Sequence, residues 1–270
     1  MNTLDIKSAS NPVLLDASQE LDRVADAALY AARLLMEAGA PATVVHEECS
    51  RVARGLGAEH VDLRSGYASL DITISRGMSS VTRMLEVGAL GVNYRLAHAI
   101  RRSAQRIWRG GITPAEAQSE MTRLKQDTER HARWVVALAV GIACASFGRL
   151  LGMDWAAFIP VAGSGAIGQS VRHSLLQRGA NVFVVASSVA FLASSLGQLG
   201  ARWAGSTTLD LAMIASVLLL VPGVPALNGQ RDILEGHPTL GAARAVVVAM
   251  ILIFIATGVL IARALLGIWR

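Results

Sequence analysis

The second half of the chain is nearly free of charge, and this feature most constrains the fold. Residues 134–270 carry 4 acidic and 8 basic side chains, whereas residues 1–133 carry 16 and 17. Five charge-free apolar runs follow Arg133. With flanking residues that can snorkel, each run reaches the length of a spanning helix, about 20 residues with a lower limit near 17. We therefore expect a mainly α-helical membrane protein, in which a small N-terminal α+β domain precedes a five-helix transmembrane domain.

The charge pattern also predicts the domain boundaries. We expect a flexible tail over residues 1–18, an α+β domain over 19–131 and a transmembrane domain over 132–270. The five membrane helices are expected at about 134–151, 154–172, 180–201, 208–225 and 241–265. Tryptophans lie at the run ends, as in an aromatic belt: Trp134, Trp155, Trp203 and Trp269. Residues 1–19 lack the pattern of a secretory signal, so no cleavage is expected there.

Within the α+β domain the apolar period changes along the chain. Helical spacing predicts helices over Glu20–Glu37 and from Pro41 to about Leu56. Alternation of apolar and polar residues then predicts a short antiparallel sheet, with strands at Val61–Arg64, Leu70–Ser75 and Val81–Val87. Two further helices are expected at Asn93–Arg109 and Thr113–Arg130, the second opened by a capping box with proline at its first position.

The arginines and lysines predict the orientation. If the N-terminal domain is inside, eight basic residues flank the inner ends of the runs and four flank the outer ends. The inner set is Arg123, Lys125, Arg130, Arg133, Arg172, Arg178, Arg231 and Arg244, and the outer set is Arg149, Arg202, Arg263 and Arg270. By the positive-inside rule, we expect the N-terminal domain in the cytoplasm and the C-terminus outside.

Several other classes of function are disfavoured by composition. The pI near 9.9 could indicate a nucleic-acid binder, but the basic residues that exceed the acidic ones flank apolar runs, so membrane topology explains them better. Cys49 and Cys144 fall one in each half, which predicts neither an intrachain disulfide nor a metal site. We expect no cofactor, no metal and no nucleic-acid partner.

The sharpest local feature is the segment Val221–Pro225, which reads Val-Pro-Gly-Val-Pro. Proline removes a backbone donor and clashes with the preceding turn, so Pro222 and Pro225 should interrupt a helix. Unwound backbone at membrane depth is tolerated where it lines a cavity, and transporters use it to bind substrates and ions. The alternative is a helix that simply ends at the cytoplasmic interface.

Other candidate positions have a structural explanation beside the functional one. The segment Gly163–Gly168 matches the dinucleotide fingerprint, but it lies in an apolar run without a preceding strand, so helix packing through Gly163, Ser164, Gly165 and Gly168 is favoured. Asp154 and Asp210 lie at run ends, where capping or surface roles are expected.

Two groups of polar residues in the α+β domain also have both a functional and a structural interpretation. His46–Cys49 is expected to be a solvated helix face rather than a metal or nucleophile site. A basic stripe could dock lipid headgroups or a partner, or could simply be solvated: Arg101, Arg102, Arg106 and Arg109.

Three stretches of the chain resemble one family. They are Leu35–Thr43, His131–Phe147 and Ala215–Asn228, the last followed by Asp232 and Gly236-His237. This set is similar to the threonine/serine exporter family, specifically its YjjP-type larger subunits, and the Val-Pro-Gly-x-Pro…Asn…Asp…Gly stretch is the most specific part. The resemblance covers nearly the whole chain from residue 20 on.

The resemblance implies a subunit that exports small amino acids or dicarboxylates such as succinate across the bacterial cytoplasmic (inner) membrane. Long family members carry a second, smaller membrane half that is missing here, which implies a separate small membrane subunit of the YjjB type as partner. The expected substrate pathway comprises Pro222, Gly223, Pro225, Asn228, Arg231 and Asp232. The alternatives are a membrane-anchored enzyme and a sensor whose soluble domain carries the activity, but no nucleophile, base and orienting group are visible there.

Overall fold

The computed structural model describes residues 12–128 and 131–267, which form two compact units. The first contains the N-terminal part of the chain up to residue 129 together with residues 227–244. The second contains residues 130–226 and 245–270. Residues 227–244, which the sequence analysis assigned to the transmembrane domain, thus belong with the N-terminal residues. One reason is that Leu240 is buried in the same hydrophobic cluster as α1 and α2.

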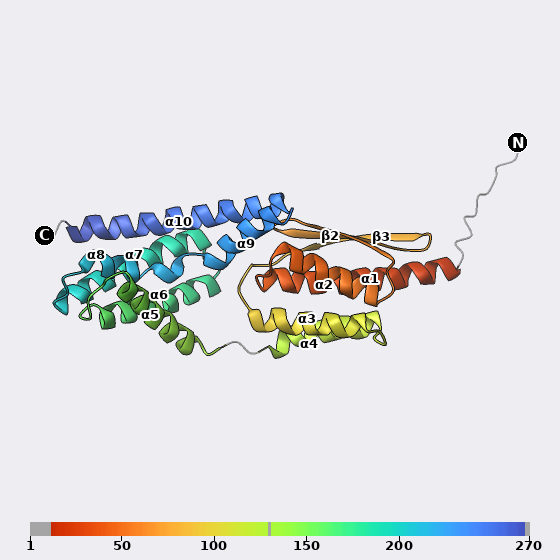
Figure 1. Cartoon of the computed structure of the whole chain (residues 1–270), viewed down its shortest axis with the longest axis horizontal. Helices are drawn as coiled ribbons and strands as arrows, with labels where there is room; N and C mark the ends of the chain where they lie inside the picture. The colour runs from red at the N-terminus through yellow and green to blue at the C-terminus, as the bar shows by residue number, and fades with distance from the viewer. Residues whose placement is uncertain (1–11, 129–130, 268–270) are drawn as a thin grey trace, which may run out of the picture. The chain divides into compact units, whose positions relative to one another are not determined.

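The N-terminal unit is built from four helices and three strands, together with most of α9 and the start of α10 from further along the chain (Figure 1). In chain order they are α1 (Pro12–Glu37), α2 (Ala42–Gly55), β1 (His60–Ser65), β2 (Ser69–Arg76), β3 (Ser79–Glu86), α3 (Tyr94–Trp108) and α4 (Pro114–Asp127). All of the predicted elements occur with the predicted type. The helix α1 begins at Pro12, so residues 12–18 belong to a helix and not to a tail, while residues 1–11 and the predicted helix end at Arg130 lie outside the described residues.

The sheet is antiparallel with the order β1-β2-β3, and Leu63 pairs with Ile72 across the first two strands. On the central strand Leu70, Ile72 and Ile74 are buried, because alternate residues of a strand face the same side. The helices α1 and α2 lie between this sheet and the pair α3–α4 (Figure 1). The capping box at the start of α4 is present as predicted, with Thr113 and Glu116 bonding reciprocally.

The turn between α1 and α2 requires glycine. Gly39 has a φ of +86°, a conformation that L side chains rarely adopt. A Cβ at this position would also lie 2.5 Å from the carbonyl oxygen of Gly91. This tight turn places the backbone of residues 39–42 where the candidate site described below is built.

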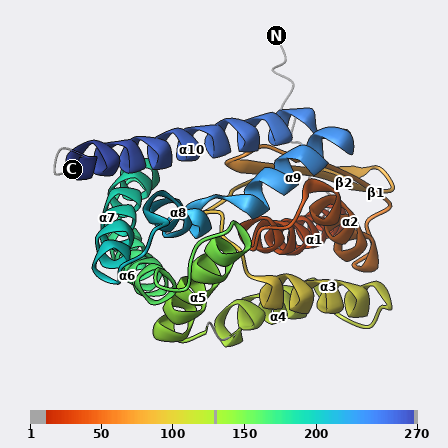
Figure 2. The same ribbon diagram turned by 60° about the vertical axis from the view of Figure 1, so that its left-hand side comes forward.

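The second unit is entirely helical in its described residues (Figure 2). It contains α5 (Arg133–Leu150), α6 (Phe158–Gln177), α7 (Val182–Trp203), α8 (Leu209–Ala215) and the 3-10 helix η1 (Leu218–Leu220). The helices α9 (Gly223–Leu234) and α10 (Pro238–Gly267) run from one unit into the other.

Three of these helices are long and apolar enough to cross a membrane: α5, α7 and α10. The segment Leu209–Leu220 and α9 meet the same criterion only as a pair, and they are bent by 59°. The described residues therefore contain three candidate spans, or four if the bent pair is one span, and the expected number of five is not reached. The helix α6 does not qualify, and its last turns carry Gln169, Arg172, His173 and Gln177.

Glycines set the closest helix contacts in the second unit. A Cβ at Gly141 of α5 would lie 2.1 Å from the carbonyl oxygen of Ala162 in α6. A Cβ at Gly258 of α10 would lie 2.2 Å from the carbonyl oxygen of Ser187 in α7. Helix backbones can approach this closely only where no side chain intervenes, as at small-residue contacts in membrane proteins.

Candidate functional site

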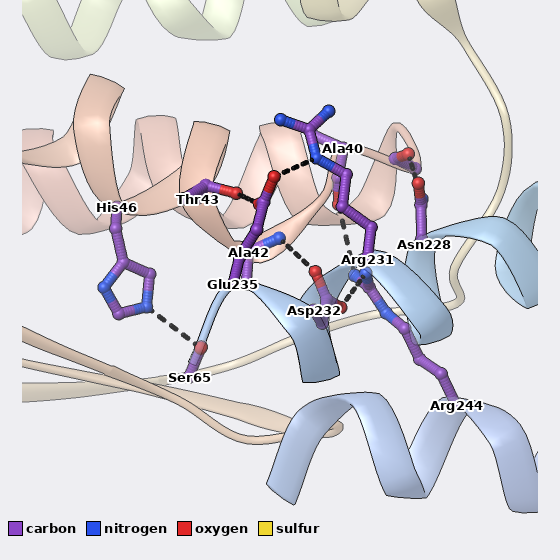
Figure 3. Close-up of polar contacts among 11 residues, drawn as sticks. Ala40, Ala42, Thr43, His46, Ser65, Asn228, Arg231, Asp232, Glu235 and Arg244 are labelled. Atoms are coloured by element: carbon purple, nitrogen blue, oxygen red, sulfur yellow. Dashed lines mark hydrogen bonds and ion pairs between the residues drawn. The ribbon is translucent and has the colours of Figure 1, made fainter. Parts of the chain in front are cut away.

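The candidate site is a polar cluster in the first unit, where the hairpin of α9 and α10 meets the turn between α1 and α2 (Figure 3). Its centre is an ion pair between Asp232 of α9 and Arg244 of α10, with 2.5 Å between Oδ2 and Nη1. The side chains are 0% and 3% exposed, respectively. A buried charge is costly unless it is paired and hydrogen-bonded, so the remaining atoms of both groups need partners.

Both charges find those partners on the backbone of one turn. Asp232 Oδ1 accepts a hydrogen bond of 2.8 Å from the N–H of Ala42, the first residue of α2. The first N–H groups of a helix lack intrahelical acceptors and carry partial positive charge, so a carboxylate is favoured there. Arg244 Nη2 donates to the carbonyl oxygen of Ala40 at 3.1 Å. The pair therefore fastens the α9–α10 hairpin to the start of α2.

Asn228, one turn before Asp232 on α9, reaches the same turn. Its Nδ2 donates to the carbonyl oxygen of Gly39 at 2.8 Å (Figure 3). Asn228 and Asp232 are four residues apart and so lie on one face of the helix. The turn thus bonds to the hairpin through the backbone of residues 39, 40 and 42.

A more exposed chain of contacts lies beside this centre. Thr43 donates its hydroxyl hydrogen to Glu235, and Arg231 Nε contacts the other carboxylate oxygen of Glu235 at 2.6 Å. The hydrogen bonds from Thr43 and Arg231 lower the pKa of Glu235 below its usual value. Arg231 is therefore turned along its own helix toward Glu235, while Asp232 points to α2 and Arg244.

Two histidines complete the cluster. The rings of His46 in α2 and His237 in the α9–α10 loop have centroids 4.5 Å apart, and His46 Nε2 lies 3.0 Å from Ser65 Oγ. Burial, and to a smaller extent the nearby His237, lower the pKa of His46 to about 4, against an opposing effect of Asp62. At neutral pH His46 is thus uncharged, and its ring contacts the tilted ring of His237 in the hairpin loop.

The predicted solvated face at His46–Cys49 is wrong in its second half. Glu48 is 1% exposed and contacts Arg51 at 2.5 Å and Arg101 at 3.2 Å. Burial raises the pKa of the Cys49 thiol to about 12. The helix turns Glu48 and Cys49 inward because it packs on both α1 and α3. A thiol with this pKa is not a nucleophile at physiological pH, and no group of three metal-ligating side chains occurs among the described residues.

The predicted pathway residues divide between the two units. Asn228, Arg231 and Asp232 belong to the cluster just described, whereas Pro222, Gly223 and Pro225 lie in the second unit. The helix α8 ends at Ala215, η1 follows, and α9 begins at Gly223. The interruption therefore covers residues 216–222 and starts before the prolines, and Pro225 lies in the first turn of α9, where its missing N–H costs nothing.

A cleft lies beside this interruption, inside the second unit. It has a volume of about 410 Å³ and is lined by His131, Val135, Val136, Ala139, Val140 and Leu219. All of these residues except Leu219 come from α5 or the segment just before it, and Leu219 belongs to η1. At the other end of the interruption, Ser216 Oγ lies 2.8 Å from Ser164 Oγ of α6, and both side chains are buried.

Of the four residues predicted to pack helices, three lie at contacts with neighbouring helices in the described part of the chain and one does not. A Cβ at Gly165 would lie 3.2 Å from Cys144 Sγ of α5, and one at Gly168 would lie 3.1 Å from Ala193 of α7. Ser164 is buried and bonds to Ser216. Gly163 is exposed, and a Cβ there would meet no described atom within 4 Å, so among the described residues it takes no part in helix contact.

The two aspartates predicted for surface roles lie at helix ends. Burial would raise the pKa of Asp154, but hydrogen bonds from Thr207 and Ala157 N–H and from the Ser206 hydroxyl outweigh it and hold the pKa at about 2. Asp154 thus ties the α5–α6 loop to the α7–α8 loop. Asp210 is exposed in the first turn of α8.

Sequence reasoning missed Arg244 and His237 as members of the site. Arg244 entered only as a flanking charge that could snorkel, yet it is the one charged residue between Pro238 and Ala262 of α10. An isolated charge in a long apolar helix is a functional or structural candidate by default, and that signal could have identified it. Its partner could not be found in this way, because the 12-residue separation crosses a turn.

Comparison with known proteins places these features in context. The profile of a family described as "Putative threonine/serine exporter" matches residues 26–266. The "Probable succinate transporter subunit YjjP" of Klebsiella aerogenes is 25% identical over 241 residues, which cover 89% of this chain and 93% of the relative. The protein of the same name from Escherichia coli (strain K12) is 26% identical over 235 residues, which cover 87% and 91%.

A third relative matches only part of the chain. An "Uncharacterized protein" of Haemophilus influenzae is 26% identical over 124 residues, which cover 46% of this chain and 41% of the relative. No solved structure matches the chain significantly.

Proposed function

The chain belongs to the threonine/serine exporter family, and from that premise we propose that it is the larger subunit of an exporter for small carboxylates in the bacterial inner membrane. The observation that carries the proposal is the extent of the match: the family profile covers residues 26–266, and relatives named as succinate transporter subunits align over more than nine-tenths of their own length. The apolar helices α5, α7 and α10 agree with a multi-pass membrane protein.

The substrate class follows from what the two names share. Threonine and serine, in the family description, and succinate, in the relatives' names, all carry a carboxylate. We place dicarboxylates such as succinate first, because the relatives with that name align over nearly the whole chain. Small amino acids such as threonine and serine are the second class.

The interruption between α8 and α9 is the proposed part of the pathway. The positive end of α9, with Pro222, Gly223 and Pro225 in or next to its first turn, would attract a carboxylate without placing a charge in lipid. The cleft beside η1 supports this proposal, because unwound backbone in a membrane is tolerated where it lines a cavity. Gly223 leaves open space around it, since a Cβ there would meet no described atom within 4 Å.

Asn228, Arg231 and Asp232 would contribute to the pathway only if their present contacts open. The carboxylate of Asp232 is held by Arg244 and the N–H of Ala42, so binding an amine or carrying a proton requires release of that pair. We propose that these contacts instead connect α9 and α10 to the N-terminal unit. Movement of the hairpin during transport would then be transmitted through Asp232 and Arg244.

The partner is proposed to be a small membrane subunit of the YjjB type, since the relatives are named as subunits. The arginine bias supports a cytoplasmic location of the N-terminal unit. An enzyme or a sensor is the less favoured alternative, because the family and the named relatives are transporters.

The test is counterflow in proteoliposomes. The full chain would be reconstituted alone, with the small subunit, and without either protein, and uptake of labelled succinate, serine and threonine would be compared. We expect succinate counterflow only when both subunits are present. Counterflow of serine and threonine without succinate would reassign the substrate, and no flux of any of the three with both subunits would refute the proposed function.

A further inference from the structure

The helix α3 carries a basic surface that the transport proposal does not use. Between Tyr94 and Arg109 there is no acidic residue, and five arginines have exposed side chains: Arg95, Arg101, Arg102, Arg106 and Arg109. The opposite face of α3 is buried against the domain core through Leu96, Ile100 and Ile107. The helix thus presents one strongly positive side to its surroundings.

The arginines differ in what they contact. Arg101 pairs with the buried Glu48, and Arg106 pairs with Glu120 of α4. Neither Arg102 nor Arg109 forms an ion pair with a described residue, in contrast to Arg101 and Arg106. Arg95 also forms no ion pair with a described residue, but only Arg102 and Arg109 of these three line the cleft described next, so they supply the available charge there.

A cleft brings the available arginines together. It has a volume of about 540 Å³, lies between α3 and α4, and is lined by Ala99, Arg102, Ser103, Gln105, Arg106, Arg109 and Leu124. This volume falls in the range of small-ligand sites, roughly 300–1,000 Å³. Three guanidinium groups around one cleft match the geometry of a phosphate, which arginine binds through paired N–H donors.

A buried hydroxyl group at this cleft lacks a partner. Ser103 is 1% exposed, and its Oγ has no hydrogen-bond partner among the described residues. Buried polar atoms are nearly always hydrogen-bonded, so an unpartnered one calls for an explanation. A hydroxyl next to Arg102 on the floor of a basic cleft can donate to an anion's oxygen.

Aromatic side chains flank the basic surface at both ends of α3. Tyr94 is 68% exposed and Trp108 is 53% exposed. Tyrosine and tryptophan are enriched at the membrane–water interface, because one part of each ring system is apolar and another part is polar. Arginines combined with exposed aromatic residues on one helix are typical of contact with lipid headgroups.

The connection to the first membrane helix is short enough to bring α3 near a membrane. Only residues 128–132 separate α4 from α5, and five extended residues span at most about 18 Å. The helix α4 has 14 residues and is about 21 Å long. The length of this connection therefore limits the distance between α5 and the end of α4, on which α3 packs with Arg106 paired to Glu120.

We propose that the α3 cleft, formed around Arg102, Arg106 and Arg109 with Ser103 at its floor, binds the phosphate group of an anionic phospholipid of the membrane that holds the chain. Arg102 and Arg109 supply the free charge, and Arg106 shares its charge with Glu120. Tyr94 and Trp108 contact the glycerol and upper acyl region. This lipid binding does not depend on the proposed transport function, and it can be measured without a transport assay.

The test uses the full chain in mild detergent and measures retained lipid by native mass spectrometry. The probes are dioctanoyl phosphatidylglycerol and, as the neutral counterpart, dioctanoyl phosphatidylcholine. We expect the chain to retain phosphatidylglycerol at least tenfold more strongly, and this preference to weaken as salt rises. The double variant R102Q/R109Q should lose about tenfold in phosphatidylglycerol affinity.

The matched control is R23Q/R64Q, which removes two exposed arginines from α1 and β1 and should bind as the natural chain does. If the glutamine variant folds poorly, R102K/R109K keeps the charge but not the paired N–H donors, and it should lose less affinity than R102Q/R109Q would while still binding more weakly than the natural chain. Equal loss in R102Q/R109Q and R23Q/R64Q would overturn the proposal, because it would show non-specific attraction. Displacement of phosphatidylglycerol by equimolar inorganic phosphate or succinate would also overturn it, because the cleft would then take soluble anions.

Discussion

The carboxylate of Asp232 and the guanidinium of Arg244 lie 2.5 Å apart and are almost completely buried, although one side chain belongs to α9 and the other to α10. Each also bonds to the backbone that opens α2, through Ala42 and Ala40. These two buried charges therefore hold the α9–α10 hairpin against the start of α2. The pair connects elements that are about 190–200 residues apart in the chain.

Removal of one partner should be far more damaging than removal of both. Asp232→Ala leaves Arg244 buried without a counter-charge, and we expect a loss of about 3–5 kcal/mol in the free energy of unfolding in detergent. The double variant Asp232→Leu with Arg244→Met should recover much of that loss, because it removes both desolvated charges.

The control for this prediction is Glu235→Ala, which removes a more exposed carboxylate three residues away. Its loss should be far smaller than that of Asp232→Ala, because exposed ion pairs contribute little to stability. If Asp232→Ala unfolded at the same denaturant concentration as Glu235→Ala, the Asp232–Arg244 pair would not stabilise the fold in the way that its burial and hydrogen bonds indicate.

The histidine pair should make stability depend on pH. The folded chain keeps the pKa of His46 at about 4, below the ordinary value of 6.5, so the unfolded chain binds a proton at a higher pH than the folded one. Stability from neutral His46 is complete above pH 6.5 and is lost as pH falls toward 4. After allowance for solvent exposure, the loss is roughly 1–2 kcal/mol.

The measurement is the free energy of unfolding at pH 7.5 and pH 4.5 for the natural chain and for His46→Gln. Glutamine can keep the bond to Ser65 but does not titrate, so the pH-dependent loss should shrink by the amount that His46 contributes. His98→Gln, at an exposed position of α3, is the control and should leave the pH dependence unchanged. An unchanged slope in His46→Gln would contradict the prediction.

Much of the N-terminal unit could be predicted from sequence because its signals are local. Alternation in Leu70–Ser75 follows directly from a strand with one buried face, and the Thr113–Glu116 capping box marks a helix start by its own hydrogen bonds. The error at Glu48 and Cys49 arose because the α2 face that carries them is covered by α3, a contact made by residues about 50 positions further on.

The second unit was harder to predict, because apolar runs reveal helices but not where those helices break. The interruption starts at Ser216, and a buried bond from Ser164 on another helix holds that position, which no nearby proline signals. Asp232 and Asn228 could be selected as polar residues after a proline-rich break. Their actual partners, Arg244 and the residues of the Gly39–Ala42 turn, depend on tertiary packing that sequence spacing does not encode.

Substitution by alanine should change stability in different ways at Gly141 and Gly163. Gly141→Ala would push a methyl group to 2.1 Å from the carbonyl oxygen of Ala162, so α5 and α6 must separate, at a cost of about 1–3 kcal/mol. Gly163→Ala meets open space and should be neutral or slightly stabilising in a helix. Thermal unfolding of the single chain in detergent measures both. A lower melting temperature for Gly163→Ala than for Gly141→Ala would contradict the packing.

Reporter fusions would test the orientation. The five-span topology expected from the sequence, in which α6 also crosses the membrane, predicts that fusions at Gly179 and Gly236 read as cytoplasmic and those at Gly152 and Gly205 as external. The positions are loop glycines with positive φ, so fusions there interrupt no described helix. An external reading at Gly179 would overturn this topology and with it the cytoplasmic N-terminal unit.

The last prediction concerns the interruption itself. The double variant Pro222→Ala with Pro225→Ala restores two N–H donors at the start of α9, so the 3-10 segment before it can continue as one helix. If the interruption forms part of the pathway, succinate flux with the small subunit should fall at least tenfold while membrane insertion stays normal. Pro160→Ala is the matched control, since Pro160 also lies in the first turn of a helix, α6, and should leave flux near normal. A chain whose α9 simply starts at the interface would transport normally in both variants. Flux at the natural level from the double variant, at equal membrane abundance, would therefore decide against a pathway through residues 216–225.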